Sequence, residues 1–174
     1  MPKLIRPTTA YKDSFIATVR EFQENDPDHY FPIITGLDID EVESDFDAYV
    51  ERCLSGEHTP EQPGWVKATY MWLLEDDELL GIINIRHELN DHLRQYGGHI
   101  GYGIRPSQRR KGYASDMLRL SLPVARDLGI VKLLLICDTL NIGSQKVIEA
   151  NGGILEKTAP GETYEMMYWW IDIA

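Results

Sequence analysis

The sequence predicts a single domain of the mixed α/β class, residues 1–174, with the element order β-α-α-β-β-β-α-β-α-β-β. Three observations lead to this prediction. Apolar residues at helical spacing fill the first third of the chain, two apolar strands joined by a short acidic turn follow, and strand–helix alternation comes after them. A hairpin followed by a strand–helix–strand crossover requires a mixed sheet, and 174 residues suffice for one full core.

The first third of the chain is expected to contribute a short strand and two helices. The strand covers residues 4–6 and stops at a proline. A first helix ends near Asn25, a loop with two prolines and a glycine spans residues 25–37, and a second helix runs over residues 40–54. The apolar stripes that predict the helices are Tyr11, Phe15, Val19 and Phe22 in the first, and Val42, Phe46, Tyr49, Val50 and Cys53 in the second.

The middle of the chain reads as a hairpin of residues 68–74 and 79–86, then a strand at residues 99–104. A helix follows from Tyr113 and is closed by Gly129. Pro123 lies inside this helix, and we expect it to bend or shorten the helix because proline cannot donate to the carbonyl one turn earlier.

The last third is expected to supply one buried strand, one helix and two closing strands. Residues 131–138 are nearly continuously apolar, as in a strand covered on both faces. Asn141 is placed to cap a helix that ends at Gly152. The closing strands are assigned to residues 152–157 and 162–173.

Composition excludes several functional classes. A formal charge of −11 and a pI near 4.8 argue against general nucleic-acid binding, which needs a broad basic surface. No apolar run approaches the roughly 20 residues of a membrane span, and the amino-terminal residues resemble no secretory signal, so we expect a cytoplasmic protein. Cys53 and Cys137 lack metal or disulfide spacing, so no metal site is expected.

Positive charge is nevertheless concentrated in one segment, residues 105–111. Four cations, Arg105, Arg109, Arg110 and Lys111, occupy seven positions just before Gly112 and a predicted helix. The amino end of a helix offers free amides and a positive dipole to an anion, and glycine allows close approach of the main chain. The spacing matches neither a phosphate-binding GxxxxGK[ST] loop nor a dinucleotide GxGxxG turn. A solvated turn with no ligand remains the alternative reading of the charges alone.

The run from Arg109 to Ala114, RRKGYA, resembles the (Q/R)xxGx(G/A) signature of the GNAT acetyltransferase superfamily. The preceding strand HIGYGI and the following NIGSQKVIEANGG are similar to the family's fourth strand and its N-x-x-(A/S) helix. The resemblance covers roughly residues 79–155. The stretches RHELN, GGHIGYGIRPS and VIEANGG together resemble a bacterial branch of predicted acetyltransferases.

The resemblance implies acetyl-CoA as the cosubstrate. The diphosphate is then held by the amides around Arg109, Arg110, Lys111, Gly112, Tyr113 and Ala114. The resemblance also implies that the main chain near Tyr102 and Ile104 holds the pantetheine arm. It further implies that Asn141 and Ser144 reach the cofactor from the next helix. For Asn141, capping its helix is an alternative role that does not exclude the first.

Acetyl transfer to an amine requires a polarised thioester carbonyl, a base and an acid. A backbone N–H near Tyr102 can polarise the carbonyl. His99, His87 and Glu88 are the candidate bases, because they lie on or next to the strand that the resemblance places beside the cofactor. The family's usual acid is a tyrosine at the position of Ile148, so the acid is missing here. Tyr164, Tyr168 and Cys137 remain open as substitutes.

The acceptor is expected to be a primary amine of a small molecule or a peptide. In similar folds the first two helices line its site, and the acids there would attract a cationic amine: Asp26, Asp28, Asp38, Asp40 and Glu41, with Tyr30 and Phe31 covering its apolar part. An acidic loop that only keeps the protein soluble is the alternative. A catalytically silent acetyl-CoA-binding module, supported by Ile148, is the alternative to an enzyme. Trp169 and Trp170 suit either a homodimer seam or the protein's own core.

Overall fold

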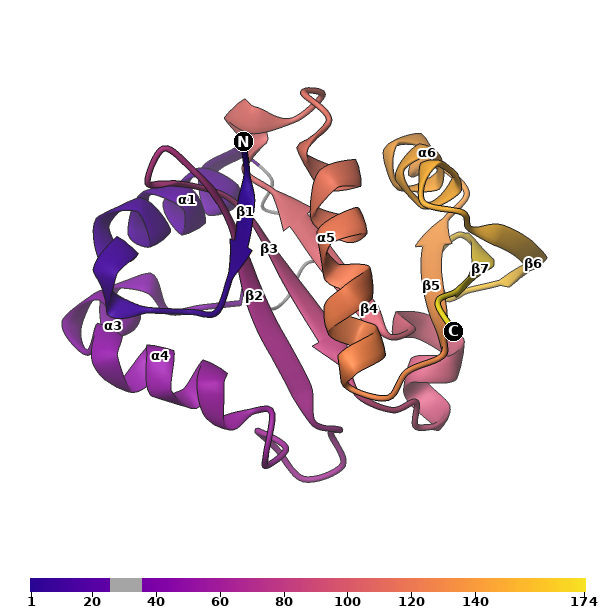
Figure 1. Ribbon diagram of the computed structural model, residues 1–174, viewed down its shortest axis with the longest axis horizontal. Helices are drawn as coiled ribbons and strands as arrows, with labels where there is room; N and C mark the ends of the chain where they lie inside the picture. The colour runs from indigo at the N-terminus through magenta and orange to yellow at the C-terminus, as the bar shows by residue number, and fades with distance from the viewer. Residues whose placement is uncertain (26–35) are drawn as a thin grey trace.

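The structure is a computed structural model that describes residues 1–25 and 36–174 (Figure 1). In chain order the main elements are β1 (Lys3–Ile5), α1 (Lys12–Asn25), α3 (Ile39–Ser44), α4 (Phe46–Ser55), β2 (Ala68–Glu75), β3 (Glu78–Arg86), β4 (Ile100–Ile104), α5 (Tyr113–Asp127), β5 (Lys132–Asp138), α6 (Ile142–Ala150), β6 (Ile154–Pro160) and β7 (Glu165–Asp172). Short helical turns lie at Thr9–Tyr11, Leu93–Gly97 and Pro106–Gln108. The mixed α/β prediction is confirmed.

The strands form two antiparallel groups, β1-β2-β3-β4 and β5-β7-β6. Helices α1, α3 and α4 lie on one side of the four-stranded sheet and α5 lies on the other (Figure 1). Alternation along β2 serves both cores, because Trp72 packs with the α1 and α4 side while Met71 and Leu73 pack with α5. No helix within the described ranges is both long and apolar enough to cross a membrane.

The hairpin between β2 and β3 is tighter than the sequence indicates. Asp76 and Asp77 alone form the turn, and their φ angles are 49° and 63°. Two left-handed residues in succession match the twist of an antiparallel pair, and aspartate tolerates this conformation better than most residues.

One expectation about helices is wrong, and the shortening that Pro123 could have caused does not occur. The helix expected over residues 40–54 is divided at Asp45, whose φ of −137° is not helical. The Asp45 carboxylate accepts the Ala48 N–H at 3.1 Å and so starts α4 as a new helix. Pro123 does not shorten α5, which continues four residues further to Asp127.

The carboxyl-terminal strand β7 is the middle strand of its sheet. Trp169 is buried in the core between α5 and β5, and Trp170 is half-buried, with the Lys132 ammonium 5.1 Å from its ring centre. The sequence offered both tryptophans to a dimer seam or a core, and the structure shows that they differ: Trp169 belongs to the protein's own core, whereas Trp170 is only partly covered.

Candidate active site

The two sheets separate between β4 and β5, and His99 marks the point where they part. The His99 N–H donates to the Leu134 carbonyl at 2.7 Å, and the Leu134 N–H donates to Nδ1 of His99 at 2.9 Å. From Ile100 onward, β4 pairs with β3, and none of the described residues links it to β5 through the backbone. This leaves an opening between β4 and β5, and each of the two strands has one free edge along it.

The register of β4 places the amides of alternate residues on this free edge. Beyond the strand, Arg105 donates its N–H to a carbonyl of β3 at 2.8 Å. Hydrogen-bonded pairs alternate along an antiparallel ladder, so Gly101 and Gly103 are the residues that bond to β3. The amides of Tyr102 and Ile104 therefore point toward β5.

The turn before α5 exposes a second group of amides. Arg110 and Gly112 both adopt left-handed φ angles, 61° and 88°. Among the described residues, no hydrogen-bond partner is found for the amides from Arg110 to Ala114. A Cβ added at Gly112 would meet nothing within 4 Å, so the turn is open to solvent. These free amides and the dipole of the 15-residue helix α5 suit an anion.

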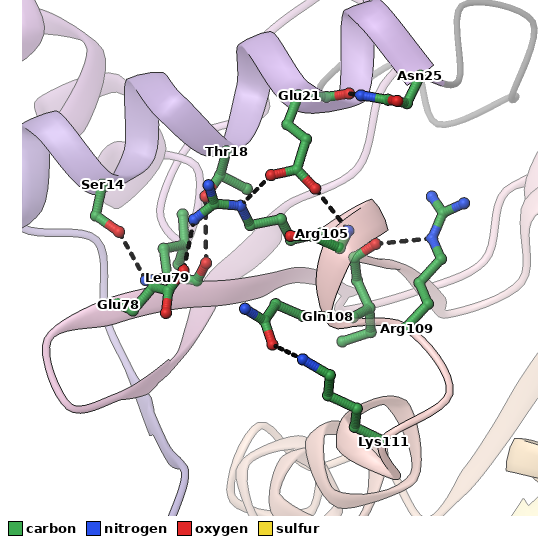
Figure 2. Close-up of polar contacts among 12 residues, drawn as sticks. Ser14, Thr18, Glu21, Asn25, Glu78, Leu79, Arg105, Gln108, Arg109 and Lys111 are labelled. Carbon is green, nitrogen blue, oxygen red and sulfur yellow. Dashed lines mark hydrogen bonds and ion pairs between the residues drawn. The ribbon is translucent and has the colours of Figure 1, made fainter.

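Arg105 is held inside the protein. Its Nε donates to Glu21 of α1 at 2.5 Å, its Nη1 donates to Glu78 at 2.8 Å, and the Ser107 N–H donates to Glu21 at 2.6 Å (Figure 2). Burial disfavours ionisation of Glu21, but the hydrogen bonds from Arg105 and Ser107 outweigh it and keep the pKa of this carboxyl below its ordinary value. Helix α1 is thereby fastened to the loop that follows β4.

The other three cations divide between packing and solvent. Arg109 donates from Nε to the Ile104 carbonyl at 3.0 Å (Figure 2). Its guanidinium lies 5.6 Å from the centre of the Phe22 ring. Arg110 and Lys111 are exposed beside the open turn, and Lys111 donates to the Gln108 side chain at 2.8 Å. Of the predicted basic cluster, Arg110 and Lys111 are thus the pair placed to attract a bound anion.

Helix α6 covers the β5 side of the opening. Asn141 caps it by accepting the Ser144 N–H at 2.9 Å, which bears out the capping role of Asn141. The hydroxyls of Ser144 and Tyr102 lie 2.8 Å apart, which joins α6 to β4. Burial raises the pKa of Tyr102 to about 12. Ile148, where the family carries tyrosine, is buried at 1% exposure.

The candidate bases occupy different places. His99 is 7% exposed, and burial, with Arg94 and Arg86 nearby, lowers its pKa to about 4. His87 Nε2 lies 2.9 Å from the Thr69 hydroxyl on β2, so its ring is directed away from β4 and the opening. Burial and the positive charges of Lys67 and Arg6 lower the pKa of His87. Glu88 is exposed just after β3.

The predicted acceptor loop is only partly within the described residues. Asp26, Asp28, Tyr30 and Phe31 lie outside them. Asp38 caps α3 by accepting the Glu41 N–H at 3.1 Å, and Asp40 pairs with an arginine of α1 at 3.3 Å. Both acids have structural partners. The contact of Asp38 is a local helix cap, whereas the partner of Asp40 is set by the packing of α3 against α1 and could not be predicted from the sequence.

Two contacts around the candidate site were not predicted from the sequence. Glu21 reaches Arg105 across 84 positions of sequence, and no local pattern marks such a pair. The Tyr102 hydroxyl meets Ser144 because α6 packs over the opening. Alternation along residues 99–104 was the available signal, since it puts Tyr102 on the face it shares with Ile100 and Ile104.

A sequence model described as "Acetyltransferase (GNAT) domain" matches residues 4–154. The chain belongs to this family. The recognition made from RRKGYA and its flanking elements is thereby confirmed. No curated protein sequence matches the chain.

Solved structures share the fold at low sequence identity. The ribosomal L7/L12 alpha-N-protein acetyltransferase RimL, in complex with coenzyme A, is 16% identical with TM-score 0.71 and covers 98% of this chain and 93% of its own. The microcin C7 self-immunity acetyltransferase MccE, in complex with acetyl-CoA and AMP, is 16% identical with TM-score 0.70, covering 98% and 92%. Mycobacterium smegmatis RimJ, in complex with CoA-disulfide, is 15% identical with TM-score 0.71, covering 98% and 81%.

Proposed function

We propose that this protein transfers an acetyl group from acetyl-CoA to a primary amine of a small molecule or a peptide. The observation that carries the proposal is the opening between β4 and β5, whose free amides lead to the open turn before α5. Solved structures of this fold hold coenzyme A or acetyl-CoA, which supports the same cosubstrate here.

The residues at both ends of the opening fit acetyl-CoA. The amides from Arg110 to Ala114 suit the diphosphate, and Gly112 leaves the main chain bare where it would approach. Arg110 and Lys111 add positive charge at the same turn. The free edge of β4 offers the Ile104 amide to the pantetheine arm, while Asn141 and Ser144 line the other side from α6.

The chemistry needs few side chains. Acetyl-CoA supplies an activated acetyl thioester when bound. The Tyr102 N–H, on the free edge of β4, donates to the carbonyl oxygen and stabilises the charge that develops there. Removal of a proton from the amine is the remaining requirement.

We assign His99 to holding β4 and β5 together rather than to the role of base. Its Nδ1 accepts the Leu134 N–H, so the neutral ring carries its proton on Nε2 and has no free lone pair. His87 is directed toward β2. Glu88 is the member of the predicted set that remains accessible, and solvent is the alternative proton acceptor.

A catalytically silent acetyl-CoA-binding module is the second candidate, and buried Ile148 favours it because the family's tyrosine is absent. Titration calorimetry with acetyl-CoA tests cofactor binding, and thiol release in the presence of small primary amines and short peptides with free amino termini tests transfer. We expect saturable binding and amine-dependent release. Binding without release for every acceptor would favour the silent module, and no binding would refute both candidates.

Acetyl-CoA and its acceptor do not specify an oligomeric state. A homodimer stays a prediction. Because Trp169 is buried within one chain, the interface of such a dimer has to consist of other residues. Light scattering of the purified protein measures the mass directly.

A further inference from the structure

Three polar side chains meet where β4, β5 and α6 enclose the opening. The Tyr102 hydroxyl of β4 lies 2.8 Å from the Ser144 hydroxyl in the first turn of α6. Cys137 of β5 is close enough for its thiol to interact with Ser144 as well. The two strands that flank the opening therefore both send polar groups to the same turn of α6.

Position 148 shows why a phenol at this turn matters. Long side chains on a helix point toward its amino terminus and cover the preceding turn. A tyrosine at position 148 would therefore carry its hydroxyl over the turn that holds Ser144, four residues earlier. Ile148 cannot supply that group and is packed in the core at 1% exposure. Tyr102 brings a phenol hydroxyl to the same turn from β4.

We propose that the Tyr102 hydroxyl protonates the thiolate that leaves during acetyl transfer, and that Ser144 positions the phenol. This inference rests on the proposed function. The amine nitrogen forms a bond to the acetyl carbon as the carbon–sulfur bond breaks, and the electron pair of that bond stays on sulfur. Sulfur takes the proton from Oη of Tyr102. The phenolate regains a proton from solvent, and the surplus proton on the new amide nitrogen leaves to solvent.

The hydrogen bond between Ser144 and Tyr102 allows the phenol to donate its proton to sulfur. A serine hydroxyl carries a single proton, and when Ser144 donates it to the Tyr102 oxygen, the phenol proton is free to turn toward sulfur. The phenol is protonated at neutral pH, and the hydrogen bond with Ser144 offsets part of the rise in the pKa of Tyr102 that burial causes. Tyr102 also supplies the amide that faces the thioester carbonyl, and the sulfur is bonded to that same carbonyl carbon.

The pKa of the thiol of bound coenzyme A tests the proposal without an identified acceptor. It is measured from ultraviolet thiolate absorbance for the wild type, Tyr102→Phe and Ser144→Ala. A hydrogen bond to a charged group shifts a pKa by about one to two, so Tyr102→Phe should raise the thiol pKa by that amount and Ser144→Ala by less. Tyr70→Phe is the matched control, because its buried hydroxyl bonds to Glu61 on the far side of the sheet. The control should leave the thiol pKa unchanged.

Each result decides between the two proposals. Equal coenzyme A affinity with a raised thiol pKa in Tyr102→Phe supports the proton donor. Normal affinity with an unchanged thiol pKa in both Tyr102→Phe and Ser144→Ala overturns it and leaves cofactor binding intact. If Tyr102→Phe fails to fold, an unchanged thiol pKa in Ser144→Ala alone overturns it. Absence of coenzyme A binding by the wild type refutes the proposed function itself.

Discussion

Replacing Glu21 with glutamine preserves the shape of the side chain and removes the charge that fastens α1 to the loop after β4. Glutamine can still accept the Ser107 N–H, but it loses the charged partner of Arg105. The side chains of Arg105 and Glu21 are only 17% and 18% exposed, so solvent screens this pair weakly. The substitution therefore tests how much this contact between α1 and the loop after β4 contributes to stability.

The expected cost follows from the contacts. A hydrogen bond between charged groups contributes about 1.5–3 kcal/mol, and Arg105 retains Glu78 at 2.8 Å, so we expect the free energy of unfolding to fall by about 2 kcal/mol. For a domain of this size that is a decrease in Tm of about 4–8 °C. Chemical denaturation at neutral pH measures the free energy of unfolding. Glu24→Gln, on the exposed side of the same helix, is the control and should change neither.

The pH dependence gives a second test. Because the native pKa of Glu21 lies below 4.5, its ordinary value, its contribution is present above pH 4.5 and is lost as the pH falls through the native pKa. The stabilities of the wild type and Glu21→Gln should therefore converge in acid. A difference below about 0.5 kcal/mol at neutral pH, no larger than that of a neutral surface substitution, would refute the reasoning.

Three further predictions concern the rest of the site. Neutralising Arg110 and Lys111 together to glutamine should weaken acetyl-CoA binding about tenfold at low salt and less at high salt, as calorimetry at two ionic strengths will show. The pKa of His99 is about 4 in the native state and 6.5 ordinarily, so between these pH values the unfolded chain binds more protons than the native protein. The free energy of unfolding of the wild type should therefore fall by about 3 kcal/mol as the pH drops from 6.5 to 4. His99→Asn, which keeps an acceptor for Leu134, should flatten that dependence in acid denaturation; an unchanged slope would contradict the assignment. Glu88→Gln should lower the rate with any accepted amine by about 100-fold at neutral pH, and an unchanged rate would leave solvent as the base.

Much of the fold follows from local pattern, because burial of alternating or helically spaced apolar residues is a local property. The stripe of Phe15, Val19 and Phe22 predicts α1, and the acidic turn between two apolar runs predicts the hairpin. The division at Asp45 was missed because a carboxylate that caps one helix reads like any polar residue inside another. Periodicity does not reveal such a cap when the apolar stripe continues through it.

The parts of the candidate site that consist of backbone could be predicted from the sequence. Gly112 before α5 signals the open turn, and glycines in residues 99–104 signal a bare strand. Roles that depend on contacts between distant elements were not predictable. His99 looked like a base because imidazole titrates near neutral pH, yet its hydrogen bond to Leu134, 35 positions away, gives it a partner that the sequence does not show.

The binding of acetyl-CoA by the wild type, Gly112→Leu and Gly152→Leu tests the central claim most directly. Both glycines have similar left-handed φ angles, 88° and 84°, and neither has an atom within 4 Å of an added Cβ, so the two substitutions carry the same backbone cost. Only Gly112 lies at the turn before α5. We predict that calorimetry shows saturable acetyl-CoA binding by the wild type and Gly152→Leu, and at least a tenfold loss for Gly112→Leu, about 1.4 kcal/mol or more. Equal affinity in all three proteins would contradict the claim that the free amides of this turn hold the diphosphate.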